Sequence, residues 1–223
     1  MKKYAVIVAG GKGNRMGSEL PKQFIQLNDK PILMHTLQTF KLYIADIQII
    51  LVLPANDIQL WKELCIKHSF NIEHTIAEGG ETRFHSVKNG LQLVDNDSLV
   101  AIHDGVRPFV SKSVIENSFI TAQTHKAVVP VIDIVDTIRE LDGSESHTVS
   151  RDKYKIVQTP QTFLSNIVKD AYSQDYDDKF TDDASVVESV GVKIKLIEGN
   201  RENIKITTPF DLIIGNALVK CST

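Results

Sequence analysis

A glycine-rich loop near the start of the chain carries the first residues whose types and spacing could do chemistry. Residues 10–17 read GGKGNRMG and follow the apolar run Tyr4–Ala9, which is typical of a buried parallel strand. Because glycine has no Cβ, the backbone of such a loop can approach a ligand closely and point several N–H groups at it. Lys12, Arg15 and, a little further on, Lys22 add positive charge. This combination predicts a phosphate-binding loop.

Two common phosphate-binding loops do not fit these residues. A Walker A loop ends in Gly-Lys-Ser/Thr, whereas Lys12 is followed by Gly13. The dinucleotide fingerprint requires a third glycine where Met16 stands and a helix that runs straight on, but Pro21 interrupts such a helix. The loop would therefore bind phosphate in a different way. The simpler alternative is a glycine-rich turn between strand and helix whose lysines are solvated.

A second candidate group follows the apolar run 99–103, where residues 103–108 read HDGVRP. Asp104 could bind Mg²⁺ or accept a hydrogen bond from a hydroxyl group, because Mg²⁺ uses one or two carboxylates together with substrate phosphates. The alternative is that Asp104 pairs with Arg107 and caps the next helix. We interpret His103 as a packed side chain rather than as a base.

Two further cations, Lys205 and Arg151, could belong to the site or could simply be solvated. Lys205 alternates with two isoleucines, which predicts a strand with the lysine on the opposite face. The seven histidines show no metal-ligand spacing, so a zinc site is not expected. The chain has no G-x-S-x-G motif, and Cys65 falls inside a predicted helix. Serine or cysteine nucleophiles therefore have no support.

The composition is that of an ordinary globular protein. The 223 residues are 42% hydrophobic and 24% charged, with a net charge of −3, which favours a single domain over residues 1–223. No basic excess points to nucleic acid, and no apolar run is long enough for a membrane span. The two cysteines form no C-x-x-C pair. We therefore expect a cytoplasmic protein without disulfides, nucleic-acid partners or membrane segments.

Helical and strand patterns alternate along most of the chain. The predicted helices span residues 31–43, 57–68, 82–93, 111–125, 164–173, 181–191 and 209–219. Asn56 or Asp57 is the predicted N-cap of the second of these helices. The predicted strands span residues 4–9, 47–53, 71–77, 99–103 and 192–197, and a further strand begins at 127–130. This order predicts an α/β fold, with a mostly parallel twisted sheet and helices on both faces. The glycine-rich loop, Gly79-Gly80 and His103-Asp104 would then share one crevice at the carboxyl ends of the strands.

Residues 132–156 interrupt the alternation. They alternate apolar and polar side chains on both sides of a turn at Asp142-Gly143, which predicts a β-hairpin. The hairpin could be a plain edge element, or an arm that reaches a second subunit. Because Ile132, Ile134 and Ile138 would leave an edge prone to pairing with another chain, we favour a dimerisation arm.

Nine segments, taken together, resemble the 2-C-methyl-D-erythritol 4-phosphate cytidylyltransferase family over essentially the whole chain. In order they are AGGKGNRMG, PKQF, GGETRFHSV, HDGVRPF, DTIRE, TVSRDKY, QTPQTF, TDDASVVE and ENIKITTPFDL. The resemblance implies a Rossmann-like nucleotidyltransferase that transfers CMP from CTP to a polyol phosphate and releases pyrophosphate. It also implies Mg²⁺ as cofactor, a homodimer, and a place in non-mevalonate isoprenoid biosynthesis.

The same resemblance assigns roles by motif position. It implies that Arg15 and Lys22 stabilise the transition state at the α-phosphate, and that Arg151 and Lys205 hold the substrate phosphate. It places Asp104, Arg107 and Thr137 at substrate-binding positions, with Asp104 as the candidate metal ligand. The nucleotide-binding positions implied are Ala9, Gly10, Gly11, Lys12, Gly13, Gly80, Glu81, Arg83 and Ser86.

Two other functions stay open at this point. Ribitol 5-phosphate cytidylyltransferases share the loop, the HD-x-x-RP segment and the KITT segment, although TDDASVVESVG and TVSRDKY are more similar to the methylerythritol family. A non-catalytic nucleotide-binding module of similar fold is more distant, since it would not need Arg15, Lys22, Arg151 and Lys205 together.

Overall fold

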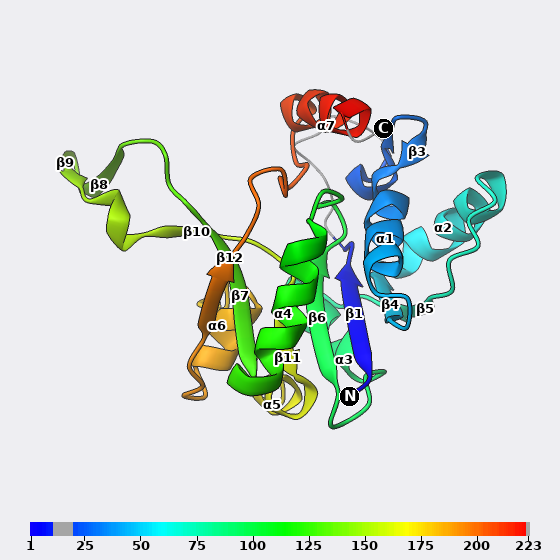
Figure 1. The fold of residues 1–223 in the computed structure, drawn as a ribbon, viewed down its shortest axis with the longest axis horizontal. Coiled ribbons are helices and arrows are strands. Elements are labelled where there is room, and N and C mark those ends of the chain that lie inside the picture. Colours follow the sequence, from blue (N-terminus) through cyan, green and yellow to red (C-terminus); the bar gives the residue numbers. More distant parts are fainter. Residues whose placement is uncertain (11–19, 222–223) are drawn as a thin grey trace.

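The computed structural model describes residues 1–10 and 20–221, and its centre is one eight-stranded sheet (Figure 1). The strand order is β10-β7-β11-β6-β1-β4-β5, and β12 also pairs with β7. The strands are β1 (Lys3–Val8), β4 (Gln48–Leu53), β5 (Thr75–Glu78), β6 (Leu99–Asp104), β7 (Ala127–Asp133), β10 (Lys155–Val157), β11 (Gln161–Leu164) and β12 (Lys195–Glu198). The apolar residues of β1, β4, β6 and β7 are mostly buried because helices cover the sheet from both sides, whereas Ile156 and Val157 of β10 and Leu196 of β12 are exposed.

Two hydrophobic layers hold those helices against the sheet. One face packs on α1 (Ile32–Tyr43), α2 (Ala55–Lys67) and α4 (Lys112–His125) through Phe40, Trp61 and Phe119. The other face packs on α3 (Arg83–Leu91), α5 (Ser165–Ala171) and α6 (Asp183–Glu188) through Phe84, Val168 and Val187. The predicted α/β fold with helices on both faces is confirmed.

The sheet is mostly parallel, as predicted, with one strand that the sequence pattern did not reveal. Strands β6, β1, β4 and β5 form a parallel set, and β12 runs parallel to β7. Strand β11 lies between β6 and β7 and is antiparallel to both, and β10 is antiparallel to β7. Strand β11 is short, and buried polar side chains at Gln161 and Thr162 break its apolar pattern.

Two local predictions were wrong. Helix α2 begins at Ala55, and Pro54 occupies its N-cap position without a side-chain hydrogen bond, because the proline side chain has no acceptor atom. Asp57 instead accepts a hydrogen bond from Gln23. Lys205 lies in irregular chain rather than in a strand, since residues 203–207 pair with no strand of the sheet.

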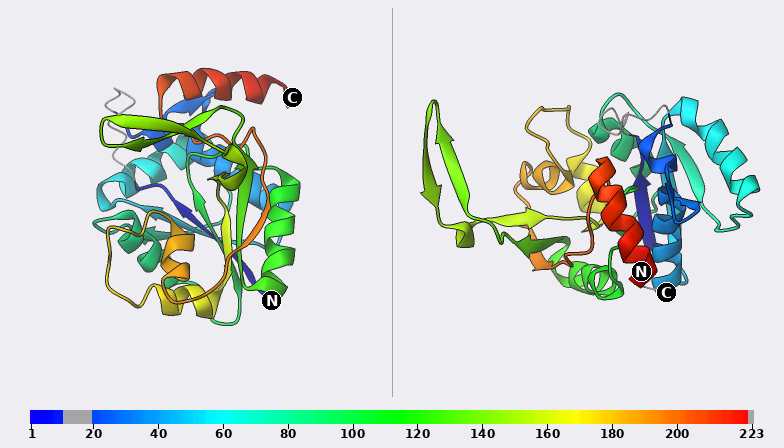
Figure 2. Two further views of the ribbon diagram at one scale, coloured as in Figure 1. Left: turned by 90° about the vertical axis from the view of Figure 1, so that its left-hand side faces the viewer. Right: turned by 90° about the horizontal axis from the view of Figure 1, so that it is seen from above.

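The predicted hairpin is present and projects from the body of the protein (Figures 1 and 2). Its strands β8 (Ile138–Asp142) and β9 (Glu145–Val149) pair with each other in a separate two-stranded sheet. Gly143 adopts a φ of 58° in the tight turn, a conformation that glycine reaches without strain. Ile132 does not belong to the free arm, because it lies in β7 opposite Ile156.

The remaining elements close the carboxyl edge of the sheet. A short ribbon, β2 (Gln26–Leu27) with β3 (Lys30–Pro31), and the terminal helix α7 (Pro209–Cys221) lie beyond the ends of β1 and β6 (Figure 1). They pack around a small cluster that contains Leu27, Val106 and Ile206. Of the helices described, none has both the length and the apolar character that a membrane span requires.

Candidate active site

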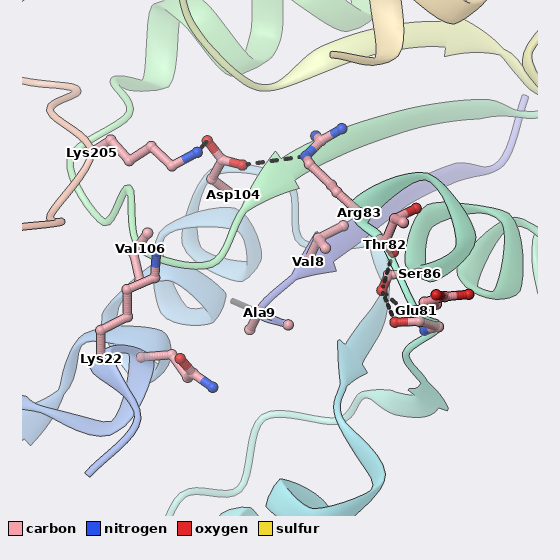
Figure 3. Close-up of a pocket in the computed structure, with 13 residues that line it drawn as sticks. Val8, Ala9, Lys22, Glu81, Thr82, Arg83, Ser86, Asp104, Val106 and Lys205 are labelled. Carbon is pink, nitrogen blue, oxygen red and sulfur yellow. Dashed lines mark hydrogen bonds and ion pairs between the residues drawn. The ribbon is translucent and has the colours of Figure 1, made fainter. Parts of the chain in front are cut away.

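A pocket of about 190 Å³ lies at the carboxyl ends of the central strands, where the sequence predicts a shared crevice (Figure 3). Its described lining comes from the end of β1, the Lys22 turn, the segment before α3 with the first turn of that helix, the end of β6 and the Lys205 loop. The lining residues are Val8, Ala9, Gly10, Lys22, Gln23, Gly80, Glu81, Thr82, Arg83, Ser86, Asp104, Val106 and Lys205. Figure 3 shows Lys22 and Lys205 on one side of this space, and Arg83 and Ser86 on the other.

The turn that carries Lys22 is firmly anchored. Lys22–Phe24 form a 3₁₀ turn, η2, in which the backbone N–H of Phe24 donates to the Pro21 carbonyl at 2.9 Å. The Phe24 ring is buried and stacks on Trp61, with centroids 6.2 Å apart. The neighbouring Gln23 is also buried and donates to Asp57 at 3.0 Å. These contacts fix the backbone from which the lysine reaches the pocket.

The opposite wall is built by a hydrogen-bonded turn at the start of α3. The Ser86 hydroxyl accepts from the Gly80 N–H at 3.1 Å and lies 3.0 Å from the Thr82 carbonyl, to which it donates. Thr82 caps α3 by accepting from the His85 N–H. A Cβ at Gly80 would lie 2.4 Å from the Cβ of His85, so this close turn requires glycine. Small residues thus leave backbone groups accessible at the pocket.

Asp104 is the electrostatic centre of the site. Its Oδ2 lies 3.1 Å from Arg107 Nε and 3.0 Å from Lys205 Nζ, and its Oδ1 lies 3.8 Å from Arg83 Nε. Burial opposes ionisation of this carboxyl, but the charges of Arg83, Lys205 and Arg107 outweigh it and hold its pKa well below the usual range. Asp104 is therefore a carboxylate throughout the physiological pH range. The ion pair between Asp104 and Arg107 that the alternative interpretation predicts is present. It does not cap the next helix, because Ser111 is the N-cap residue of α4.

Arg83 bridges Asp104 to a second buried carboxylate. Its Nη1 and Nη2 donate to Asp183 Oδ1 and Oδ2 at 2.8 and 2.6 Å, a two-pronged pairing that planar guanidinium favours. Tyr172 donates to the same Asp183 Oδ1 at 2.6 Å. Burial disfavours the charge of Arg83, but Asp183 and then Asp104 reverse this effect and raise its pKa. The guanidinium is a permanently charged part of the pocket wall.

His103 is a packed residue, as predicted. It is fully buried, and its ring meets Phe40 edge-on at 4.9 Å between centroids. Its Nε2 donates to the Arg107 carbonyl at 2.9 Å, so Nδ1 can accept from the Thr159 hydroxyl at 3.0 Å. That hydroxyl in turn accepts from the Asp104 N–H at 3.1 Å. Burial lowers the pKa of His103 to about 4, so the ring is neutral and holds the end of β6 in place.

The structure brings most of the predicted site residues together. Nine of them line the pocket: Ala9, Gly10, Lys22, Gly80, Glu81, Arg83, Ser86, Asp104 and Lys205. Arg107 sits behind the pocket, where it joins Asp104 to the Asn203 carbonyl. Gly11, Lys12, Gly13 and Arg15 lie outside the described residues.

Thr137 and Arg151 do not reach this pocket. Thr137 is exposed on the arm, and Arg151 begins the 3₁₀ turn η3 (Arg151–Lys153) beyond it. The Arg151 guanidinium donates to the Val135 carbonyl at the base of the arm. Thr137 and Arg151 therefore cannot act in the described pocket of their own chain in this conformation, and any active site that they serve lies elsewhere.

Several residues around the site were not predicted from the sequence. Gln23, Thr82 and Val106 line the pocket, and Thr159, Asp183 and Asn203 support it from behind. The sequence motifs TDDASVVE and QTPQTF contain Asp183 and Thr159, but nothing in their spacing shows that Asp183 faces Arg83 or that Thr159 faces His103. Only contacts across the fold reveal these pairs.

A mostly parallel sheet whose carboxyl edge gathers lysine, arginine and one ionised aspartate is the arrangement expected of an α/β nucleotidyltransferase, which must bind several phosphate groups. The family profile of 2-C-methyl-D-erythritol 4-phosphate cytidylyltransferase matches residues 4–221. The chain belongs to this family.

Similar proteins match along nearly their whole lengths. A protein of Bacteroides thetaiotaomicron with that family's name is 60% identical over 219 residues, covering 98% of this chain and all of the relative. One of Porphyromonas gingivalis is 47% identical and covers 98% of each chain. The crystal structure of 4-diphosphocytidyl-2C-methyl-D-erythritol synthase from Anaerococcus prevotii superposes with a TM-score of 0.82 at 30% identity, covering 98% of each chain. The cytidylyltransferase of Thermus thermophilus gives 0.77 at 29% identity, covering 99% of this chain and 100% of that one.

Proposed function

We propose that this chain transfers CMP from CTP to 2-C-methyl-D-erythritol 4-phosphate in the cytoplasm, forming 4-diphosphocytidyl-2-C-methyl-D-erythritol and pyrophosphate in non-mevalonate isoprenoid biosynthesis. The observation that carries the proposal is the pocket that joins Lys22, Asp104 and Lys205 to the Gly80–Ser86 turn. The names and the full-length similarity of the relatives support the same reaction.

The chemistry needs no enzymic base. The substrate phosphate monoester is largely ionised near neutral pH, so one of its oxygens can attack the α-phosphorus of CTP directly. A new P–O bond forms to the α-phosphorus while the bond to the β-phosphate oxygen breaks, and pyrophosphate leaves with that electron pair. The main barrier is the approach of one anion to another. Positioning and electrostatic stabilisation are then the main sources of catalysis.

The cations of the site match this requirement. We propose that Lys22, with Arg15 of the glycine-rich loop, stabilises negative charge on the α-phosphate oxygens. Lys205 would hold the phosphate of the attacking substrate together with Arg151. Its ion pair with Asp104, at 3.0 Å, keeps the ammonium group at the pocket before substrate arrives. Arg107 holds Asp104 from behind, so the carboxylate does not turn away from the pocket.

We propose that base and ribose recognition fall to the opposite wall. The Gly80 turn presents backbone groups beside Ala9 and Gly10, and Ser86 holds that turn through the Gly80 N–H. Glu81 and Arg83 flank the same side. Fixed backbone groups at close approach can distinguish donor and acceptor patterns on a pyrimidine ring, because a mismatched base would leave one of them unpaired.

Mg²⁺ fits the residues present. Asp104 is an ionised carboxylate at the pocket, and Mg²⁺ binds through one or two carboxylates together with substrate phosphates. Among the described residues no group of three or more metal-binding side chains occurs, which also suits a cation held largely by the nucleotide. We propose Asp104 as its protein ligand. When bound, Mg²⁺ would neutralise charge on the triphosphate.

We also propose a homodimer in which the arm completes the partner's site. Thr137 and Arg151 lie on or beside the arm, away from the pocket of their own chain. Val135 and Leu141 on the same projection are exposed by 54% and 78%. Apolar side chains on an exposed two-stranded ribbon favour a covered surface. A two-fold dimer would bury both arms and deliver Arg151 to the neighbouring pocket.

One assay tests the reaction and its nearest alternative. Purified protein is incubated with CTP, Mg²⁺ and either 2-C-methyl-D-erythritol 4-phosphate or ribitol 5-phosphate, and released pyrophosphate is measured. We expect turnover with the methylerythritol phosphate and little with ribitol phosphate. Preference for ribitol phosphate would assign the chain to the other reaction, and CTP binding without pyrophosphate release would indicate a non-catalytic module.

A further inference from the structure

The two oxygens of the Asp104 carboxylate have different surroundings. Oδ2 faces both Arg107 Nε and Lys205 Nζ within 3.1 Å. Oδ1 faces Arg83 Nε at 3.8 Å, which is too long for a hydrogen bond, and it has no closer cation among the described residues. One oxygen is therefore committed to the protein, while the other still has capacity for a ligand. Figure 3 shows Asp104 lying between Lys205 and Arg83.

Asp183 explains why Arg83 stays at that distance. Both Nη atoms of Arg83 are engaged by the two Asp183 oxygens, at 2.8 and 2.6 Å. Asp183 is fully buried, and Tyr172 donates to it at 2.6 Å. A buried carboxylate with this geometry holds the guanidinium in one orientation. Without it, the same charge would be free to move towards Oδ1 of Asp104.

The backbone that carries Asp183 is fixed independently of Arg83. Asp182 and Ser185 form a reciprocal capping box at the start of α6. The buried Gln161 amide donates to Asp182 at 2.7 Å and accepts from the Ala184 N–H at 2.8 Å. The position of Asp183 is thus set by β11 and by its own helix, so it can act as a fixed anchor for a side chain on α3.

We propose that Asp183 is a positioning residue that keeps Arg83 away from Oδ1 of Asp104 and so leaves this oxygen open to a divalent cation. The inference rests on the proposed metal role of Asp104. Asp183 itself lines no part of the pocket and would act only through Arg83. Tyr172 supports it by occupying a further lone pair of the same carboxylate.

Metal binding gives a readout that is independent of turnover. Mn²⁺ is titrated by electron paramagnetic resonance into protein with a CTP analogue whose α–β bridge is a methylene group. In Asp183→Asn one carboxylate oxygen becomes an amide N–H₂ group, which cannot accept a hydrogen bond from Arg83. One of the two hydrogen bonds between residue 183 and Arg83 is therefore lost. We expect Mn²⁺ to bind about tenfold more weakly, because the released guanidinium would compete for Oδ1 of Asp104 with about the energy of one charge-assisted hydrogen bond. At saturating Mg²⁺ turnover should recover, which a purely structural defect would not allow.

Two control variants separate this effect from general damage. Ser185→Ala weakens the cap of the same helix without touching Arg83, so its Mn²⁺ affinity should match the wild type. Tyr172→Phe removes one hydrogen bond to Asp183 and should weaken Mn²⁺ binding by a smaller factor than Asp183→Asn does. This variant keeps the inference testable if Asp183→Asn does not fold. The KM for the polyol phosphate should stay unchanged in both.

The outcomes also distinguish this inference from the metal assignment beneath it. If Asp104→Asn binds Mn²⁺ as tightly as the wild type, Asp104 is not the metal ligand and the inference about Asp183 fails with it. If Asp104→Asn weakens binding while folded Asp183→Asn and Tyr172→Phe do not, the metal site stands and only the positioning role is overturned. Equal weakening in Ser185→Ala would likewise overturn it, because the effect would then belong to the helix.

Discussion

Lys205 Nζ and Asp104 Oδ2 lie 3.0 Å apart, although the lysine comes from an irregular loop near the end of the chain and the aspartate from the end of a central strand. The aspartate also holds Arg107 and faces Arg83, so three cations converge on one carboxylate. Arg83 is also paired with Asp183, so three cations face two carboxylates and this cluster carries a net positive charge. Such a site suits ligands with several phosphate groups.

Lys22→Ala tests the electrostatic mechanism. We expect turnover to fall by about 10² or more, because losing one preorganised charge donor typically costs about 3 kcal/mol in the transition state. The melting temperature should change little, since the anchoring contacts of this turn belong to Phe24 and Gln23. Lys62→Ala, an exposed lysine on α2, is the matched control. A folded Lys22→Ala protein with near-normal turnover would refute the assignment.

Base choice tests the Gly80 turn. The kcat/KM of the wild type should be much higher for CTP than for UTP, and Ser86→Ala should narrow that difference by raising the KM for CTP. The reason is that Ser86 holds the Gly80 N–H in place at 3.1 Å. Steady-state kinetics with both nucleotides give the comparison. Equal kcat/KM values for CTP and UTP in the wild type would count against a cytosine-reading site.

The arm is tested by complementation between two inactive variants. Arg151→Ala and Lys22→Ala are mixed and allowed to exchange subunits. If each arm serves the partner's pocket, a heterodimer has one site with both defects and one with neither, so activity should return to about half per heterodimer. Native mass spectrometry measures the heterodimer fraction. Heterodimers without recovered activity would mean that Arg151 serves its own subunit.

The buried His103 predicts a pH dependence of stability. Its pKa is about 4 in the folded protein and 6.5 when unperturbed, so between these values the unfolded chain binds a proton that the folded chain does not. Stability should therefore fall as the pH drops from 6.5 to 4, by about 3 kcal/mol from this residue, at about 1.4 kcal/mol per pKa unit.

Urea unfolding at a series of pH values measures this contribution. The slope of the unfolding free energy against pH has contributions from His103 and from the carboxylates. In His103→Asn the contribution of the imidazole should vanish, while that of the carboxylates remains. Gln123→Asn, at an exposed position of α4, is the matched control and should keep the wild-type slope, because neither side chain titrates. An unchanged slope in folded His103→Asn would show that the imidazole does not take up its proton in this range.

Much of the fold could be predicted from the sequence because its signals are local. A six-residue apolar strand such as β1 and a helix with a threonine cap such as α3 are each specified by neighbours along the chain. The crevice could also be predicted, since parallel strands place their carboxyl ends at one edge. The hairpin could be predicted because alternation and a tight glycine turn lie within a single segment.

Other features were decided by tertiary structure alone. Strand β11 exists because a gap between β6 and β7 supplies partners for a short, partly polar segment. Lys205 follows a strand-like pattern, but its segment pairs with no strand of the sheet, and its ammonium group instead forms an ion pair with Asp104. In TDDAS the two aspartates look alike, yet Asp182 caps its own helix while Asp183 turns inward to Arg83. Residue type and spacing determined which groups this protein has for chemistry, whereas long-range packing and charge pairing decided which of them meet.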